Sequence, residues 1–340
     1  MEKKEKKVSF SLAVLLSVLF FLTACLLSCV NRTTGSASRI SVKSGPASID
    51  SASTGPGSSD LSGEGADLLS LEGKIGNSAR IISRIREGLR VHSAAITVSF
   101  DYGSDIFPEL NSVIESWMEA ALAETDAADE GDYLRYQMGG YTYKSTSTRA
   151  GGRWQYSVRI VPSYYCYLTQ EEEAGEAVRR IRRSFHFFPW TSREKKISVI
   201  YAYLCGSVHY DSVHRKNPYY HTCSTAYAAL VQGRATCQGY CTALYRLLRE
   251  EGIACRIVTG TAGEEELHAW LLAELDGAWY LLDPTWDAGQ EEYGYFLLGK
   301  EESADHLPGS DFLTEDFLQS CPMAEKAWKT RADAKRSTDQ

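Results

Sequence analysis

The feature that most constrains the fold is a polar dipeptide between two apolar runs near the C-terminal end of the chain. Asp276-Gly277 separates Leu267–Leu275 from Ala278–Asp283, and both flanking segments are rich in strand-forming residues. An Asp-Gly dipeptide in this setting predicts a two-residue β-hairpin turn, because these residues accept the positive φ angles that the turn requires. Such a turn fixes the register, and therefore fixes which residues face each other across the hairpin.

The predicted register places two reactive side chains on one face of the hairpin. Counting back from the turn pairs Leu275 with Ala278 and Trp270 with Asp283, which makes His268 a diagonal neighbour of Asp283. Diagonal neighbours across an antiparallel pair lie roughly 7 Å apart, within reach of side chains. The hairpin therefore predicts an imidazole that is oriented by a carboxylate, with its second ring nitrogen left to exchange a proton.

A cysteine upstream lies at the predicted start of a helix. Ala235–Tyr240 leads into a helical run that Gly252 ends, and Cys237 falls in its first turn. Unpaired backbone N–H groups and the helix dipole favour negative charge there, and so favour a nucleophilic thiolate. A cysteine at a helix start, or one histidine alone, is more often structural. Together, Cys237, His268 and Asp283 predict a nucleophile, a general base and an acid that orients the base.

Three blocks of sequence resemble the transglutaminase-like superfamily of cysteine enzymes, particularly its bacterial surface members. They are Ala235-Thr-Cys237-Gln-Gly-Tyr240, Leu267-His268-Ala-Trp270 and Trp279-Tyr-Leu-Leu-Asp283-Pro-Thr-Trp286-Asp287, with weaker similarity at Ile197, Tyr210-Asp211 and Tyr295-Phe296-Leu297-Leu298. The resemblance covers under half of the chain. It implies an α+β, papain-like fold in which the nucleophile begins a helix packed on an antiparallel sheet, and it assigns Cys237, His268 and Asp283 the three roles given above.

Two positions depart from the family pattern. Leu271 stands where many bacterial relatives have asparagine after His-Ala-Trp, and Cys241 stands where a small residue is usual. Neither change removes a catalytic group. Tyr240, Trp270 and Trp286 are candidates for the walls of an acyl groove, although aromatic residues at such places are at least as often part of the core.

The implied chemistry is acyl transfer on peptide or protein amides. A Cys237 thiolate attacks the amide carbonyl, His268 protonates the leaving amine, and water or an amine resolves the thioester. Peptidase, deamidase and transglutaminase-type transfer all fit this scheme. The alternative is a non-catalytic surface module for binding or scaffolding that keeps the fold. No cofactor is expected, and Cys237 and Cys241 do not have the spacing of a zinc site.

The amino terminus predicts export and membrane attachment. Residues 1–7 contain four lysines, and Val8–Val30 carries no charge, which is typical of a secretory signal or an anchor. Leu22-Thr-Ala-Cys25 resembles a bacterial lipobox, so we expect a signal peptide over 1–24 and lipidation at Cys25; a plain transmembrane anchor is the alternative. Either places the remaining chain at a bacterial cell membrane, outside the cytoplasm.

The rest of the chain divides by composition and periodicity. We predict a lipid-anchored, Ser/Gly-rich flexible linker at 25–75, a small α/β lobe at 76–185, a transglutaminase-like catalytic domain at 186–330 and a tail at 331–340. Periodicity predicts helices at 79–90 and 109–123, strands at 94–101, 141–148 and 154–162, and capped helices that begin at Thr169 and Thr191. The acidic run Glu124–Asp132 lacks the ligands of a calcium loop and is predicted to be a solvated turn.

Composition excludes several classes of protein. The chain has 340 residues, of which 44% are hydrophobic and 24% charged, which excludes a disordered or multi-span membrane protein. Its net charge of −8 gives no basic field for nucleic acid. Nine cysteines are too few for a disulfide scaffold, and an odd number leaves at least one without an intramolecular partner. Oligomeric state stays open.

Overall fold

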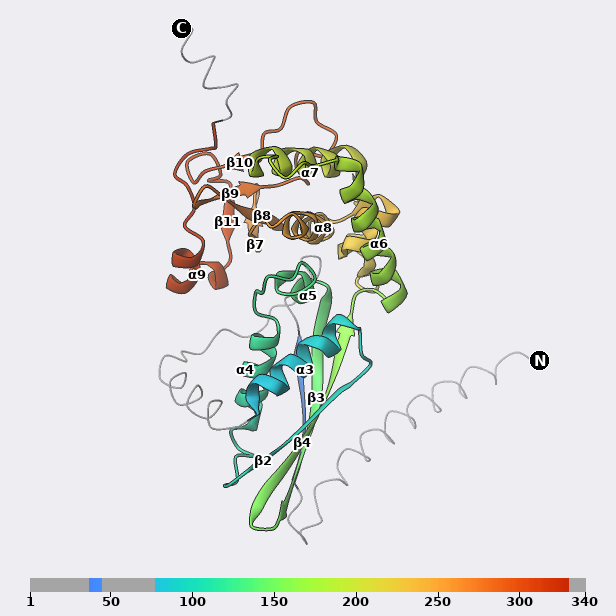
Figure 1. The fold of residues 1–340 in the computed structure, drawn as a ribbon, viewed down its shortest axis with the longest axis vertical. Coiled ribbons are helices and arrows are strands. Elements are labelled where there is room, and N and C mark those ends of the chain that lie inside the picture. Colours follow the sequence, from blue (N-terminus) through green and yellow to red (C-terminus); the bar gives the residue numbers. More distant parts are fainter. Residues whose placement is uncertain (1–36, 45–76, 330–340) are drawn as a thin grey trace, which may run out of the picture.

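The computed structural model describes residues 37–44 and 77–329, which form an N-terminal lobe and a C-terminal domain stacked along the long axis (Figure 1). The predicted signal peptide at 1–24, the lipidation site Cys25 and most of the predicted linker lie outside the described residues. Among the helices that the structure describes, none combines the length and the apolar character needed to cross a bilayer.

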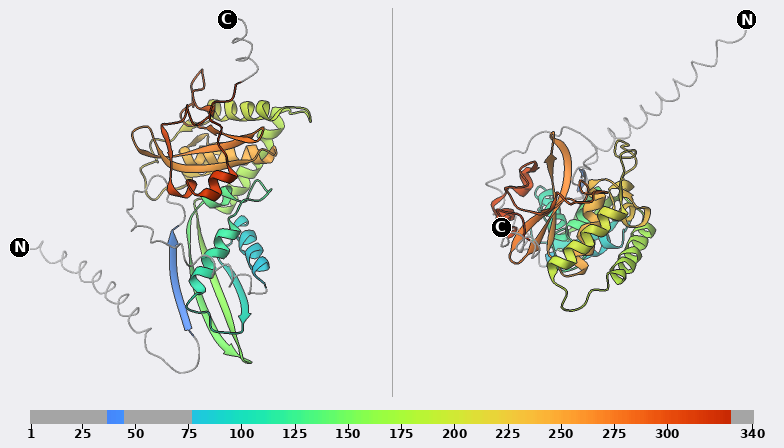
Figure 2. Two further views of the ribbon diagram at one scale, coloured as in Figure 1. Left: turned by 90° about the vertical axis from the view of Figure 1, so that its left-hand side faces the viewer. Right: turned by 90° about the horizontal axis from the view of Figure 1, so that it is seen from above.

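The N-terminal lobe is a four-stranded antiparallel sheet with helices on one side (Figure 2). Its strand order is β1 (Ala37–Ser44), β3 (Met138–Ala150), β4 (Arg153–Tyr164) and β2 (Ile96–Tyr102). Helices α3 (Ser78–Arg90) and α4 (Leu110–Ala121) pack against the face where Ile96, Val98 and Phe100 of β2 are buried. The helices and strands that periodicity predicted between 79 and 162 are therefore confirmed.

The first strand of this sheet comes from the segment that composition predicted to be a flexible linker. β1 pairs with β3 over eight residues, from Ala37 opposite Ser147 to Ser44 opposite Gly140. The physical reason lies in a short alternation within the serine-rich sequence, because the β-branched residues Ile40 and Val42 are two positions apart, as a strand requires.

The C-terminal domain packs one long helix against a five-stranded antiparallel sheet. The sheet order is β10 (Phe296–Leu298), β9 (Ala278–Leu282), β8 (Glu266–Leu275), β7 (Cys255–Ala262) and β11 (His306–Pro308). Helix α8 (Cys237–Glu250) lies on β7 and β8, and α7 (Arg193–Ser207) lies beside α8 (Figure 1). The predicted α+β architecture, in which Cys237 begins a helix packed on an antiparallel sheet, is confirmed.

Shorter elements complete this domain. A parallel pair, β5 (His209–Tyr210) with β6 (Arg234–Ala235), precedes α8, and the short helices are η2 (Thr222–Ser224), η3 (Ala228–Gln232), η4 (Ser310–Phe312) and α9 (Glu315–Ser320). The hairpin forms as predicted, with Leu275 opposite Ala278 and positive φ at Asp276 and Gly277.

Helix α6 (Leu168–Phe185) belongs with the C-terminal core, although the predicted boundary after residue 185 assigns it to the lobe. It contacts α8 and η3, and its apolar stripe joins the larger core cluster through Ala177, Val178 and Ile181. The sequence showed this stripe but not which body it faces.

Two predicted helix caps are displaced. The N-cap of α6 is Tyr167, whose N–H donates to the Gln170 side chain at 2.9 Å, rather than Thr169. The N-cap of α7 is Ser192, whose hydroxyl accepts from the Lys195 N–H, while Thr191 accepts from Phe188 instead. Neighbouring residues with suitable side chains compete for one cap, and local sequence does not decide between them.

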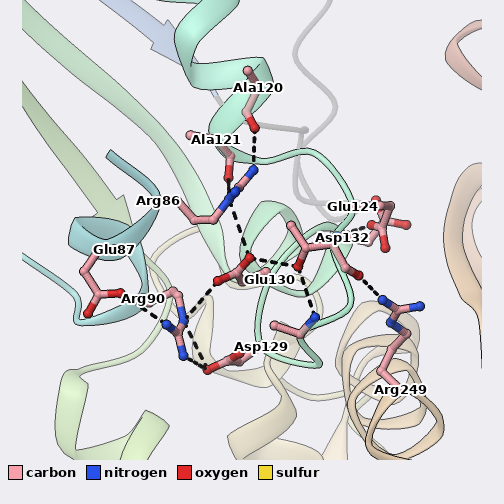
Figure 3. Close-up of polar contacts among 12 residues, drawn as sticks. Arg86, Glu87, Arg90, Ala120, Ala121, Glu124, Asp129, Glu130, Asp132 and Arg249 are labelled. Atoms are coloured by element: carbon pink, nitrogen blue, oxygen red, sulfur yellow. Dashed lines mark hydrogen bonds and ion pairs between the residues drawn. The ribbon is translucent and has the colours of Figure 1, made fainter. Parts of the chain in front are cut away.

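The acidic segment Glu124–Asp132 joins the two bodies and is not the solvated turn that its sequence predicts (Figure 3). Asp132 is buried and accepts from Arg256 Nε at 2.8 Å and from the backbone N–H of Ile257 at 2.8 Å. Tyr245 on α8 donates to Glu124 at 2.7 Å. The segment therefore fastens the lobe to α8 and β7.

Further charged contacts hold the same segment from both sides. Arg249 of α8 donates to the backbone carbonyl of Thr125, and Arg90 of α3 pairs with Asp129 at 2.8 Å (Figure 3). Burial and the nearby Asp132 carboxylate raise the pKa of Glu124 to about 7. These partners are distant in sequence, which is why composition alone indicated a hydrated turn.

Replacing Asp132 with alanine is expected to lower the free energy of unfolding by about 2 kcal/mol. The change leaves Arg256, which is 25% exposed, without its closest carboxylate and leaves the buried Ile257 N–H without its acceptor. Urea unfolding measures the effect, with Asp126→Ala as the matched control because Asp126 is an exposed acid of the same segment. Equal stability of the two variants would contradict this account of the junction.

Candidate active site

Cys237 is the first residue of α8 and is 2% exposed. The preceding residue, Thr236, has extended backbone angles, and its hydroxyl pairs with Ser224 at 3.0 Å rather than capping the helix. The backbone N–H groups of the first helical turn, where Cys237 lies, therefore have no side-chain cap. Such a helix start favours an anion.

Glycine at position 239 allows the start of α8 to pack closely on the chain that precedes it. A Cβ on Gly239 would lie 2.8 Å from the backbone oxygen of Cys223 and 2.7 Å from Ala235 Cβ. The backbone bond from Thr236 N–H to the Cys223 oxygen, at 2.9 Å, holds the same approach. Close packing therefore explains why glycine follows Cys237 by two positions in the sequence.

His268 on β8 connects the thiol to the carboxylate. Its Nε2 donates to Asp283 Oδ2 at 2.7 Å, and the ring also hydrogen-bonds the side chain of Cys237, which leaves Nδ1 as the atom facing the thiol. The ring stacks on Trp286, with centroids 5.2 Å apart. The structure therefore brings together the three residues that the sequence selected.

The electrostatics of this group follow from burial and pairing. Burial alone would lower the pKa of His268, but its hydrogen bonds with Asp283 and Cys237 and their charges raise it to about 10. Burial would raise the pKa of Asp283, yet its hydrogen bonds to His268 and His306 hold it at about 2. At neutral pH His268 is therefore an imidazolium that lies between Cys237 and the Asp283 carboxylate.

Asp283 is fixed by its second oxygen and by its backbone. Oδ1 accepts from the Thr285 N–H at 2.9 Å, and the Asp283 N–H donates to the Tyr295 oxygen at 3.0 Å. The loop that follows is held by buried Asp287, which accepts from Tyr201 Oη at 2.6 Å and from the Tyr295 N–H at 2.9 Å. This network explains why Trp286-Asp287 belongs to the motif.

The structure adds a second histidine that sequence reasoning missed. His306 on β11 places Nε2 3.2 Å from Asp283 Oδ2 and Nδ1 2.9 Å from Asp305 Oδ1. Its side chain is fully buried. The strand has only three residues and pairs with β7, far back in the chain, so periodicity carried no signal of it. The adjacent acid and histidine at 305–306 were the available clue.

Two of the three predicted groove residues lie in the core. Tyr240 is fully buried and donates to the backbone oxygen of Val208, and Trp270 is 1% exposed within an apolar cluster with Val258 and Leu281. Both face inward because α8 and β8 are covered on the sides that carry them. Trp286 is half-buried and lies over His268, the one position of the three that is consistent with a groove wall.

Seven cysteines lie within the described residues, all buried and none in a disulfide. Two groups in this part of the chain bring metal-ligating atoms within 4.8 Å of one another: His268, Asp283 and His306, and His92, Cys166 and Glu171. In the first group both histidine Nε2 atoms already pair with the same Asp283 oxygen, at 2.7 and 3.2 Å. In the second, Glu171 already accepts from Tyr133 and Gln137.

Comparison with known proteins supports the resemblance seen in the sequence. Residues 189–284 match the family model described as the transglutaminase-like superfamily, and this segment contains Cys237, His268 and Asp283. Comparison with curated proteins gives no match.

Two solved structures are similar to parts of the chain. One is the crystal structure of a TGase, with 17% identity and a TM-score of 0.33, covering 44% of this chain and 45% of that one. The other is a protein from Cytophaga hutchinsonii described as a candidate cysteine protease, with 15% identity and a TM-score of 0.27, covering 42% and 56%. This chain thus spans about half the length of the structures it matches. The resemblance therefore rests on the sequence match, in which residues 189–284 fit the model of the transglutaminase-like superfamily.

Proposed function

We propose that this protein is a thiol enzyme that transfers the acyl group of peptide or protein amides through Cys237, His268 and Asp283. The observation that carries the proposal is the buried hydrogen-bonded series from the Cys237 thiol through His268 to Asp283, which begins at the first residue of α8. A nucleophile, a proton carrier and an orienting anion are the groups that this chemistry requires.

The reaction proceeds in two stages. With the thiol proton transferred to His268, Cys237 Sγ attacks the amide carbonyl carbon, and the N-terminal amides of α8 stabilise the oxyanion. His268 Nδ1–H then protonates the amine as the C–N bond breaks, which leaves a thioester and a neutral imidazole. Water or an amine next loses its proton to His268 and attacks the thioester, and the thiol is regenerated.

The proposal also places the enzyme on the outer side of a bacterial membrane. Support comes from the sequence of residues 1–30 alone, with its lysine-rich start, its uncharged run and the Leu22-Thr-Ala-Cys25 motif. Lipidation at Cys25 would tether the catalytic domain near substrates at the cell surface. Palmitate labelling of the full chain expressed in bacteria, with loss in Cys25→Ser, tests this part separately.

Acylation by a small activated ester tests the proposed activity without knowledge of the natural substrate. Full-length protein treated with p-nitrophenyl acetate at pH 7 is expected to acetylate at Cys237 at least about 100-fold faster than the urea-unfolded chain, because only the folded site activates the thiol. Mass spectrometry of peptides locates the acetyl group. Cys237→Ser should lose the fast reaction, and Cys223→Ser, which removes another buried thiol, should keep it.

An acetylation rate at Cys237 equal to that of the unfolded chain would contradict the enzyme proposal and favour a binding or scaffolding module. If the fast reaction is present, a glutamine-containing protein such as casein with a biotinylated amine separates the reaction types. Biotin incorporation indicates amine transfer, ammonia release alone indicates deamidation, and chain cleavage indicates a peptidase.

A further inference from the structure

The Asp283 carboxylate is shared by two buried histidines, and only one of them faces the thiol. His268 Nε2 lies 2.7 Å and His306 Nε2 3.2 Å from the same atom, Asp283 Oδ2. His306 comes from β11, on the opposite edge of the sheet from β10. A strand at the sheet edge therefore contributes a side chain to the centre of the site.

The position of β11 depends on a close backbone approach. A Cβ on Gly260 of β7 would lie 2.1 Å from the Leu307 backbone oxygen, so only glycine permits this spacing. The backbone N–H of His306 donates to Ser303, and the His306 ring meets Trp270 edge-on with centroids 5.0 Å apart. The imidazole is thus held in place by packing as well as by hydrogen bonds.

Both ring nitrogens of His306 face carboxylates. Nδ1 lies 2.9 Å from Asp305 Oδ1, and Asp305 Oδ2 accepts from Tyr295 Oη at 3.0 Å. A neutral imidazole has one N–H group and can donate to only one of these acids, whereas the imidazolium donates to both. His306 therefore joins the two carboxylates, with Nε2 at Asp283 and Nδ1 at Asp305.

We propose that His306 is a positioning residue, which holds Asp283 ionised and keeps its Oδ2 atom directed at His268 Nε2. This inference rests on the proposed acyl-transfer function of Cys237. It adds a fourth side chain that does not touch the reacting atoms but determines whether the acid of the triad can orient the base.

The protonation of Asp283 reports this role, because removal of His306 takes away a hydrogen bond that lowers the pKa of a fully buried carboxylate. Burial then raises the pH at which Asp283 takes up a proton. A protonated Asp283 no longer supports the His268 imidazolium, so the thiolate is lost on the acid side.

The tyrosine and cysteine groups near Asp283 that are shifted have pKa values above the pH range of the test. Burial raises the pKa of Cys205 and of Tyr295 to about 12, and raises the pKa values of Tyr201, Tyr240 and Cys241 above their usual ranges. Asp287 accepts hydrogen bonds from Tyr201 and from two backbone N–H groups. Asp305, on the far side of His306, has its pKa lowered, against the effect of burial, by hydrogen bonds from His306 and Tyr295.

The test is the rate of Cys237 acetylation by p-nitrophenyl acetate between pH 4 and 8, measured on the full chain. His306→Phe is expected to lower the rate about tenfold at pH 7 and to move the acid limb of the profile upward by about one pH unit or more. His306→Gln, whose amide can still donate a hydrogen bond to Asp283, should fall between wild type and His306→Phe. His214→Phe removes another histidine paired with a carboxylate, Asp211, and should leave the profile unchanged.

A purely structural role for His306 would change the overall rate or the melting temperature but not the pH of the acid limb. An acid limb that coincides with wild type in folded His306→Phe overturns the inference; if that variant does not fold, the same result in His306→Gln overturns it. Slow acetylation of wild-type Cys237 would instead show that the proposed function itself has failed.

Discussion

Replacing His268 with alanine is expected to lower the rate constant for acetylation of Cys237 by p-nitrophenyl acetate about 1,000-fold at pH 7. The imidazole is the group that takes the thiol proton, and it is the partner that hydrogen-bonds both Cys237 and Asp283. Its loss leaves a buried thiol with no proton acceptor and a buried carboxylate with one histidine in place of two. Rapid-mixing measurement of p-nitrophenol release gives the rate constant.

The control for this variant is His186→Ala, which removes an exposed histidine at the end of α6 and should leave the rate unchanged. Added imidazole is expected to restore part of the rate in His268→Ala, because the space under Trp286 is left open for it. A loss smaller than about tenfold, in a variant with native unfolding behaviour, would contradict the role of His268 as the proton carrier.

Asp283→Asn is expected to have a comparable effect, a loss of about 1,000-fold or more, through the tautomer of His268. Asp283 Oδ1 accepts from the Thr285 N–H, so the asparagine oxygen should take that position and place its NH2 group where Oδ2 now lies. An NH2 group cannot accept a hydrogen bond from His268 Nε2. His268 must therefore adopt the tautomer in which Nε2 carries no proton and accepts a hydrogen bond. Nδ1 then carries the proton and cannot take another from Cys237.

The two effects of this substitution can be measured separately. Loss of the anion should lower stability as well, so urea unfolding is recorded beside the acetylation rate, with Asp311→Asn as an exposed acid of the same domain for comparison. Histidine side-chain NMR of Asp283→Asn should show the Nε2 of His268 without a proton. A rate within tenfold of wild type would contradict the account of Asp283 as the residue that sets this tautomer.

Sequence alone predicted the part of the site that depends on local geometry. The Asp276-Gly277 turn determines the register of β8 and β9, and this register is sufficient to predict that His268 lies beside Asp283. The start of α8 could also be predicted from local sequence, because signals for the end of one helix and the beginning of the next lie on either side of Cys237. These features require information from only a few neighbouring residues.

The parts that the sequence did not predict depend on contacts between distant segments. His306 reaches Asp283 only because β11 pairs with β7, and Asp132 is buried only because Arg256 and Ile257 meet it from another body of the protein. β1 was not predicted, because the serine-rich composition of its segment indicated a flexible linker. The alternation of Ile40 and Val42 was too short a signal to indicate a strand. Tyr240 and Trp270 lie close in sequence to the catalytic candidates, but both are buried in the core. Their position in the motifs therefore did not predict their exposure.

The central claim, an activated thiol at Cys237, is tested most directly by iodoacetamide labelling against pH, with each site quantified by mass spectrometry in the full chain. Wild-type Cys237 is expected to label fast and nearly independently of pH between 6 and 8, since the raised pKa of His268, about 10, keeps the imidazolium present throughout this range. His268→Ala should label slowly, with a rate that rises with pH like that of an ordinary thiol. The same slow, rising profile in wild type and variant would contradict an activated thiol and, with it, the enzyme proposal.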